Sequence, residues 1–196
     1  MLKSNINYLA FVLMFLFSGT VFSEEDKYAS VRGTLQTCTV CHGESGVSET
    51  GAYPILAGQE FYYIYVQLKD FKSGLRQNDI MSPLVANLEK SELKLMAEFF
   101  SKQEWPKSNH KGNADTKRLA LKVVNAGQCA ACHLGSFAGN SRNPRLANQH
   151  KEYLSNTMFD FKNRIRKNAQ PMNALFATFS DEEITALADY LHAFKD

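Results

Sequence analysis

A five-residue motif that occurs twice is the feature that most constrains this chain. The sequence CTVCH stands at 38–42 and CAACH at 129–133, and together they hold all four cysteines of the 196-residue protein. The offset between the first cysteines is 91 residues, and other segments recur at nearly the same offset. Such self-similarity predicts two copies of one structural unit rather than a single continuous domain.

The repeat extends well beyond the cysteine motifs. The segment PILAGQ at 54–59 corresponds to PRLANQ at 144–149, and Asp-Phe-Lys occurs both at 70–72 and at 160–162. Met81 corresponds to Met172 at the full offset of 91 residues. The duplication therefore covers nearly the whole chain beyond its N-terminal segment.

Apolar residues at helical spacing predict that each half is all-α. The last helix of each half is predicted by an i, i+3, i+4, i+7 pattern, formed by Leu93, Met96, Ala97, Phe100 and again by Ile184, Leu187, Ala188, Leu191. Middle helices are predicted by Ile64, Leu68, Phe71 and by Leu154, Met158, Phe161. Further helices are expected around 28–37 and 119–128, and Ser180 with Glu183 has the pattern of a capping box. No segment shows convincing strand alternation.

The N-terminal residues have the pattern of a signal peptide. A basic Lys3 precedes an apolar run at 8–17, and small and polar residues follow up to Ser23. The run is shorter than the roughly 20 apolar residues that cross a bilayer, so an uncleaved anchor is the weaker alternative. We expect a signal peptide at 1–23, one domain at 24–105, a polar linker at 106–114 and a second domain at 115–196. This organisation predicts export to the periplasm.

The motif C-x-x-C-H is the attachment signature of c-type haem. Two thiols about one helical turn apart can add to the two vinyl groups of one porphyrin, and the histidine then lies under the iron. Zinc sites, thioredoxin-like pairs and disulfides also use C-x-x-C, but none of them requires a histidine at the same place in both copies. The sequence therefore predicts two covalently bound haems.

Two methionines are expected to complete the iron coordination. Met81 and Met172 each lie 43 residues after the first cysteine of their half, in an expected loop beside a proline. Methionine with histidine is the cytochrome c ligand pair. Met96 and Met158 are expected to be core residues instead, because they lie on helical stripes. The predicted haem-binding residues are Cys38, Cys41, His42, Met81, Cys129, Cys132, His133 and Met172, with His42, Met81, His133 and Met172 on iron.

His110, His150 and His192 do not recur in both halves, so we expect them at the surface. A bis-histidine haem in one domain remains an alternative, and it would have a lower reduction potential.

Together these features resemble the dihaem cytochrome c4 family over essentially the whole mature chain. The resemblance rests on the two C-x-x-C-H motifs, the two Pro-x-Leu-Ala-x-Gln segments, the Asp-Phe-Lys helix ends and the paired methionines. It implies two tandem class I cytochrome c domains packed against each other. It also implies that the carbonyls of Pro54 and Pro144 accept hydrogen bonds from the haem-binding histidines. Arg76 and Arg166 would either pair with haem propionates or be solvated surface charges.

The resemblance implies an electron carrier rather than an enzyme, with redox partners such as a cytochrome bc complex and a terminal oxidase. The alternatives are an electron-transfer subunit of a dehydrogenase complex and, with less support, a dihaem peroxidase. A peroxidase needs an open iron site and a distal acid–base residue, which neither half repeats. The net charge of +2 suggests neither nucleic acid nor a membrane surface as the main partner. We expect no small-molecule substrate, and membrane contact only through partner complexes.

The net charge of the whole chain is small, but the two halves differ in the sign of their net charge. Residues 24–105 carry a net charge of −4, and residues 115–196 carry +3. Complementary fields mainly raise encounter rates. The basic half is therefore expected to meet an acidic partner, through Arg142, Arg145, Arg164 and Lys167.

Replacing Cys129 and Cys132 by alanine is expected to remove one covalent haem and leave the other, since each cysteine pair supplies both thioether bonds of one porphyrin. Mass spectrometry under denaturing conditions measures the number of haems on each polypeptide. The matched variant, Cys38→Ala with Cys41→Ala, is expected to lose the other haem. A double variant that still carries two covalent haems would show that the attachment assignment is wrong.

Overall fold

The computed structural model describes residues 26–107 and 110–195, so the expected signal peptide at 1–23 lies outside the described residues. The first half contains the short 3-10 helix η1 (Ala29–Val31) and helices α1 (Arg32–His42), α2 (Phe61–Ser73), α3 (Met81–Val85) and α4 (Lys90–Ser101). The second half contains α5 (Ala114–Ala126), α6 (Cys129–His133), α7 (Lys151–Lys162), α8 (Gln170–Phe176) and α9 (Asp181–His192). No strand occurs within these ranges, and the all-α prediction is confirmed.

Each half has its own hydrophobic core, built from the predicted helical stripes. In the first half α2 packs on α4, and the core includes Ile64, Leu68, Phe71, Leu93, Met96, Ala97 and Phe100. In the second half α7 and α5 pack on α9, with a core that includes Leu154, Met158, Phe161, Ile184, Leu187, Ala188 and Leu191. Met96 and Met158 are buried in these cores, as predicted.

The predicted capping box at the start of α9 is confirmed. The backbone N–H of Glu183 donates to Ser180 Oγ, and the backbone N–H of Ser180 donates to the Glu183 carboxylate at 2.8 Å. This reciprocal pair satisfies donors that an uncapped helix leaves exposed.

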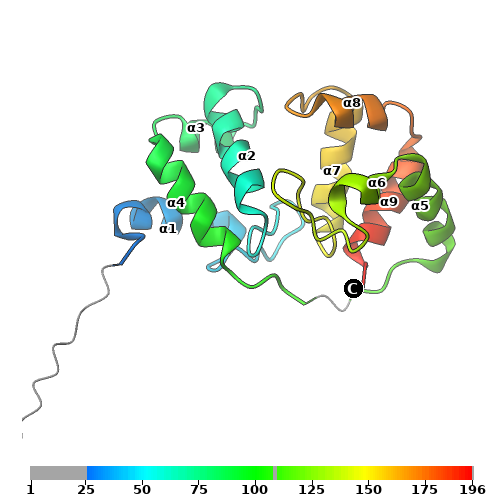
Figure 1. The fold of residues 1–196 in the computed structure, drawn as a ribbon, viewed down its shortest axis with the longest axis horizontal. Coiled ribbons are helices and arrows are strands. Elements are labelled where there is room, and N and C mark those ends of the chain that lie inside the picture. Colours follow the sequence, from blue (N-terminus) through cyan, green and yellow to red (C-terminus); the bar gives the residue numbers. More distant parts are fainter. Residues whose placement is uncertain (1–25, 108–109, 196) are drawn as a thin grey trace, which may run out of the picture.

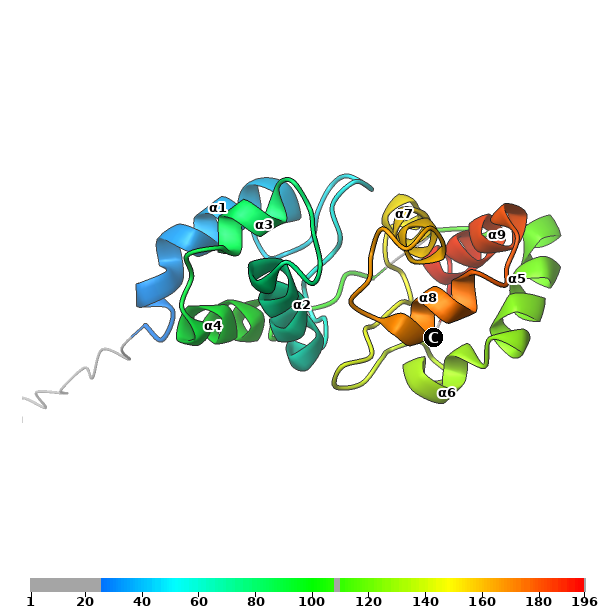
Figure 2. The same cartoon turned by 90° about the horizontal axis from the view of Figure 1, so that it is seen from above.

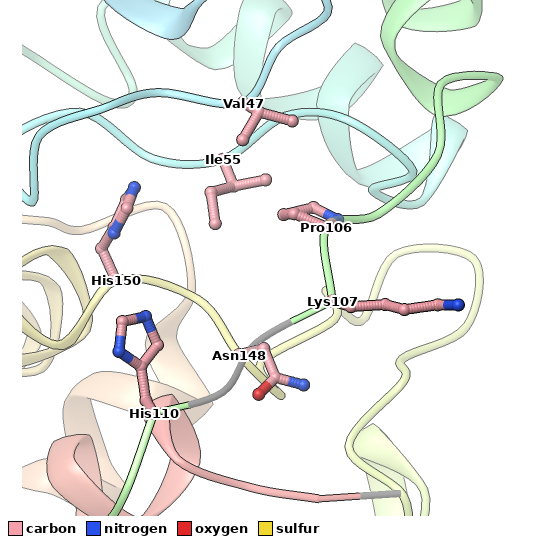
Figure 3. Close-up of a pocket in the computed structure, with 7 residues that line it drawn as sticks. All are labelled: Val47, Ile55, Pro106, Lys107, His110, Asn148 and His150. Atoms are coloured by element: carbon pink, nitrogen blue, oxygen red, sulfur yellow. The ribbon is translucent and has the colours of Figure 1, made fainter.

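The halves lie side by side, with α2 and α7 near the boundary between them (Figures 1 and 2). Hydrogen bonds cross this boundary from the two Pro-x-Leu-Ala-x-Gln segments, from α2 and from α7. The described linker residues on either side of 108–109 reach the boundary. There Pro106, Lys107 and His110 help to line a pocket of about 140 Å³ together with residues of both halves (Figure 3).

The two copies differ at the helix before the haem motif. In the first half α1 runs continuously into the motif and includes Thr37, whereas in the second half the helix is interrupted between α5 and α6. The interruption falls at Gln128, the repeat equivalent of Thr37, whose φ of 49° lies in the left-handed region. Glycine is the residue that usually marks such a conformation, because a side chain with a Cβ is disfavoured there. Gln128 gives no such signal, so the sequence did not predict the break.

The methionines predicted to bind iron lie on short helices rather than in loops, so that part of the prediction was wrong. Met81 is the first residue of α3, and Met172 lies in the first turn of α8. A proline lies in the first turn of each helix, Pro83 in α3 and Pro171 in α8. Proline is compatible with a helix start because its φ is already near the helical value. The composition of these two segments is typical of loops, and for this reason the short helices α3 and α8 were not predicted.

No helix among the described residues has both the length and the apolar composition required to cross a membrane.

Replacing Gln128 by glycine is expected to raise the free energy of unfolding by about 1 kcal/mol, because glycine adopts positive φ without a Cβ clash. The matched change Thr37→Gly lies inside a continuous helix, and it is expected to lower the free energy of unfolding by about 0.5–1 kcal/mol. Both side chains are exposed, so lost packing does not confuse the comparison. Urea unfolding of the holoprotein measures the free energy of unfolding of both variants. Equal changes at the two positions would contradict the conclusion that Gln128 is strained by its positive φ.

Candidate haem sites

The first cysteine motif occupies the last turn of α1. Cys38 packs against the hydrophobic core of the first half, and burial raises the pKa of its thiol to about 11. Val40, one of the two residues between the cysteines, is 83% exposed. One helical turn thus carries two thiols and a buried histidine.

The ring of His42 is oriented by one backbone carbonyl. His42 Nδ1 donates to Pro54 O at 2.9 Å, and the side chain is buried. Burial lowers the pKa of His42, while the hydrogen bond to Pro54 opposes this shift. Because a carbonyl only accepts, the proton lies on Nδ1 and the lone pair on Nε2 is available as a metal ligand.

The second half repeats this arrangement. His133 ends α6, its Nδ1 donates to Pro144 O at 2.9 Å, and burial lowers its pKa. Cys129 packs against the core of the second half, and burial raises the pKa of its thiol. The hydrogen bonds from histidine to proline carbonyl that the resemblance implied are therefore present in both halves.

Each predicted methionine lies against the same core as a cysteine of its own half. Met81 and Cys38 pack on the core of the first half, and Met172 and Cys129 on the core of the second. In the second half the buried Asn173 stabilises the start of α8, since its Nδ2 donates to the carbonyls of Phe161 and Arg166 at 2.7 Å. Asn173 was not predicted from the sequence, because its repeat equivalent is a serine.

The cysteine pairs lie in different halves, on α1 and α6, so they do not form one four-cysteine zinc site. Within 26–107 and 110–195, no three histidine, cysteine, aspartate or glutamate residues gather as a metal-binding group. All four cysteines are free thiols. The donor set in each half, two thiols and a neutral imidazole beside an apolar core, fits a porphyrin attached through both thiols.

Arg166 is buried, so a solvated surface role for this arginine is wrong. Its guanidinium donates to Tyr63 Oη at 3.3 Å, Gln67 Oε1 at 2.8 Å and Asn168 Oδ1 at 2.9 Å. Arg76 is half-buried and donates to Gln67 and to Tyr153 Oη. Both arginines therefore lie at the boundary between the halves.

The positive charges of Arg76 and Arg166 change the acidity of the Tyr153 phenol. Burial raises the pKa of Tyr153, but the guanidinium groups of Arg76 and Arg166 oppose this and lower the pKa to about 7. The same two guanidinium groups oppose the effect of burial on the Asp160 carboxyl, whose pKa burial raises, so negative charge close to the arginines is stabilised.

His150 and His192 are half-buried, and His150 contacts the other half, so the surface prediction was wrong for His150. His150 Nε2 lies 2.9 Å from Ser48 Oγ of the other half. His192 Nδ1 donates to Gln149 O at 2.9 Å, and its ring centroid lies 3.8 Å from that of the exposed His110. The periodicity of one helix does not report contacts between the two halves, which is why the contact of His150 was not predicted.

The family model of cytochrome c matches residues 119–195. Cytochrome c4 of Thiocapsa roseopersicina is 32% identical over 171 residues, which cover 81% of this chain and 87% of the relative. The thiosulfate dehydrogenase electron acceptor of Stutzerimonas stutzeri is 33% identical over 166 residues, covering 78% of this chain and 76% of the relative. The crystal structure of reduced recombinant cytochrome c4 from Pseudomonas stutzeri superposes with a TM-score of 0.76 at 27% identity, covering 85% of this chain and 97% of the crystallised one.

These likenesses span both halves of the chain and include the tandem arrangement of the helices. The two halves are class I cytochrome c domains, and the protein carries two covalently bound c-type haems. The chain belongs to the cytochrome c4 family of dihaem electron-carrying proteins.

Proposed function

We propose that this protein is a periplasmic dihaem electron carrier whose two irons are each bound by a histidine and a methionine. His42 with Met81 would bind the first iron, and His133 with Met172 the second. The cysteine pairs Cys38, Cys41 and Cys129, Cys132 would form the thioether bonds. The observation that carries the proposal is that both histidine rings are held, by hydrogen bonds to proline carbonyls, in the tautomer that leaves Nε2 for iron.

The ligand set and the environment both favour outer-sphere electron transfer. A bound haem supplies an iron that accepts and releases one electron, and methionine sulfur with an apolar surrounding favours the ferrous state. Hydrogen bonds to the carbonyls of Pro54 and Pro144 hold the two histidine rings, and a haem bound by histidine and methionine would need no ligand exchange on oxidation or reduction. This argues for a carrier rather than for a dihaem peroxidase, which requires an open iron site.

Respiratory complexes are the proposed partners, with a cytochrome bc complex as donor and a terminal oxidase as acceptor. A second role is favoured by the relative from Stutzerimonas stutzeri, whose name describes an electron acceptor of thiosulfate dehydrogenase. In that role the protein would receive electrons from a dehydrogenase. Reduction of the purified holoprotein by each donor in stopped-flow experiments distinguishes the two roles.

Charge on the second half supports a docking surface beside the second haem. Arg164 and Lys167 are exposed and flank Ile165, which is 66% exposed, in the segment that leads into α8. Arg145 does not belong to this surface. Its guanidinium stacks on Trp105, and its backbone is bonded to Gln59 of the first half.

Replacing Met81 by leucine is expected to abolish the weak sulfur-to-iron absorption band of one haem and to lower its reduction potential, because a soft neutral ligand is lost. Met172→Leu is expected to do the same to the other haem. The control Met96→Leu changes a buried core residue and is expected to leave both bands intact. Optical spectra of the three holoproteins test the ligand choice. A Met96→Leu protein that loses a band, or a Met81→Leu protein that keeps both, would reject it.

Reversing charge with Arg164→Glu and Lys167→Glu is expected to slow electron transfer with one physiological partner more than with the other, because steering acts at one docking surface. The slowing is expected to shrink as salt is added, since ions screen exposed charges. Lys117→Glu with Arg118→Glu, at the start of α5, makes the same charge change elsewhere in the same half. Equal slowing with both partners, or equal effects of the two double variants, would contradict this docking surface.

A further inference from the structure

Two glutamines at equivalent positions of the repeat reach across the boundary between the halves. Gln59 and Gln149 each end a Pro-x-Leu-Ala-x-Gln segment, and their side chains are only 4% and 2% exposed. Each side-chain amide binds the backbone of one residue in the segment of the opposite half. The contact occurs twice with the roles of the halves exchanged, as at the interface of a symmetric dimer.

The contact of Gln149 is directed at one backbone residue. Gln149 Oε1 accepts from the N–H of Ile55, and Gln149 Nε2 donates to the carbonyl of Ile55, both at 2.9 Å. Oε1 also accepts from the N–H of His150 at 2.9 Å. Because its oxygen meets two donors and its nitrogen an acceptor, the orientation of this amide is determined by its partners.

The N–H of Ile55 belongs to the same peptide group as the carbonyl of Pro54. That carbonyl accepts the hydrogen bond from His42 Nδ1. A single peptide group therefore joins the amide of Gln149 in the second half to the histidine of the first haem site. Ile55 and His150 lie next to each other at the pocket beside this contact (Figure 3).

The second copy has the same connection in the reverse direction. Gln59 Oε1 accepts from the N–H of Arg145 at 2.7 Å, and Gln59 Nε2 donates to the carbonyl of Arg145 at 3.0 Å. The N–H of Arg145 shares its peptide group with the carbonyl of Pro144, which accepts from His133 Nδ1. The first half thus contacts the histidine site of the second through one peptide group.

Hydrogen bonds in such a chain strengthen one another. A peptide N–H that donates to a glutamine oxygen makes its own carbonyl a more negative and therefore better acceptor, and burial preserves the effect because water does not screen it. A stronger acceptor at Nδ1 gives the histidine ring more anionic character and makes Nε2 a stronger ligand. Such a ligand stabilises ferric iron more than ferrous iron.

We propose that each glutamine lowers the reduction potential of the haem in the opposite half, through the peptide group that joins its amide to the haem-binding histidine. The two halves thereby tune each other. This inference rests on the proposed function, in which His42 and His133 bind iron. Gln59 and Gln149 act as positioning residues that neither touch iron nor bind haem.

The test replaces each glutamine by leucine, which has similar bulk and no hydrogen-bonding group, and measures the two potentials separately. A redox titration followed by NMR reports the oxidation state of each haem from its own methyl resonances. Gln149→Leu is expected to raise the potential of the first haem, and Gln59→Leu that of the second. The expected change in each ferric–ferrous equilibrium is roughly twofold to fivefold, a modest part of one hydrogen bond.

A second readout is independent of electron transfer. In the reduced, diamagnetic protein the ring N–H proton of His42 is expected to move upfield in Gln149→Leu, as its hydrogen bond weakens, while that of His133 stays in place. The converse is expected for Gln59→Leu. A merely structural role for the glutamines does not predict this crossed pattern.

Ser48→Ala is the matched control. It removes the contact of His150 with Ser48 Oγ at the same boundary, together with the hydrogen bond from Ser48 Oγ to Tyr53 O, but it leaves the peptide group between Pro54 and Ile55 without any lost hydrogen bond. It is expected to change neither potential. If Ser48→Ala shifts the first haem as much as Gln149→Leu does, loosening of the boundary explains the result and the inference is wrong.

Glutamate variants keep the test decisive if a leucine variant fails to fold. Gln149→Glu and Gln59→Glu retain the accepting oxygen and add negative charge, so they are expected to lower the potential of the opposite haem. A shift confined to the haem of the same half, equal shifts of both haems, or no shift would overturn the proposal. If the irons are not bound by histidine and methionine, the optical bands of the Met81 and Met172 variants show it. That outcome is therefore distinguishable from failure of the glutamine proposal, which is read from the two potentials.

Discussion

A hydrogen bond from a histidine ring to a proline carbonyl orients the motif histidine in each half of this molecule. It determines the tautomer of His42 and of His133, and so it determines which nitrogen can bind iron. It also limits how the ring can turn relative to the cysteines of the same motif. The proline lies in a segment without regular secondary structure, which must itself be held in place.

The opposite half of the molecule supplies much of that support. Gln59 and Gln149 bind the backbone next to Pro144 and Pro54, and α2 and α7 contribute the surrounding polar contacts. Domains of this size bury little apolar surface by themselves, so a shared boundary and a large covalent cofactor both add stability. The boundary therefore serves the haem sites as well as the packing of the halves. This connects the duplication of the chain to its function, because two similar halves can support each other with the same contacts.

Departures from symmetry show where the halves have diverged. The helix before the second motif is interrupted at the left-handed Gln128, and Asn173 anchors the second methionine helix where the first half has a serine. Net charge also differs in sign between the halves. The halves repeat the C-x-x-C-H motif and differ in the groups around it.

The sequence by itself determined the local features: the two motifs, the repeat, the buried faces of α4 and α9, and the core roles of Met96 and Met158. Each follows from the spacing of residues along one helix or from covalent chemistry that needs adjacent residues. Only the tertiary structure decided the long-range features: the burial of Arg166, the contact of His150 with Ser48, and the bonds of Gln59 and Gln149 across the boundary. These contacts join residues 80 to more than 100 positions apart. Helical periodicity carries no information about which surfaces meet at that separation.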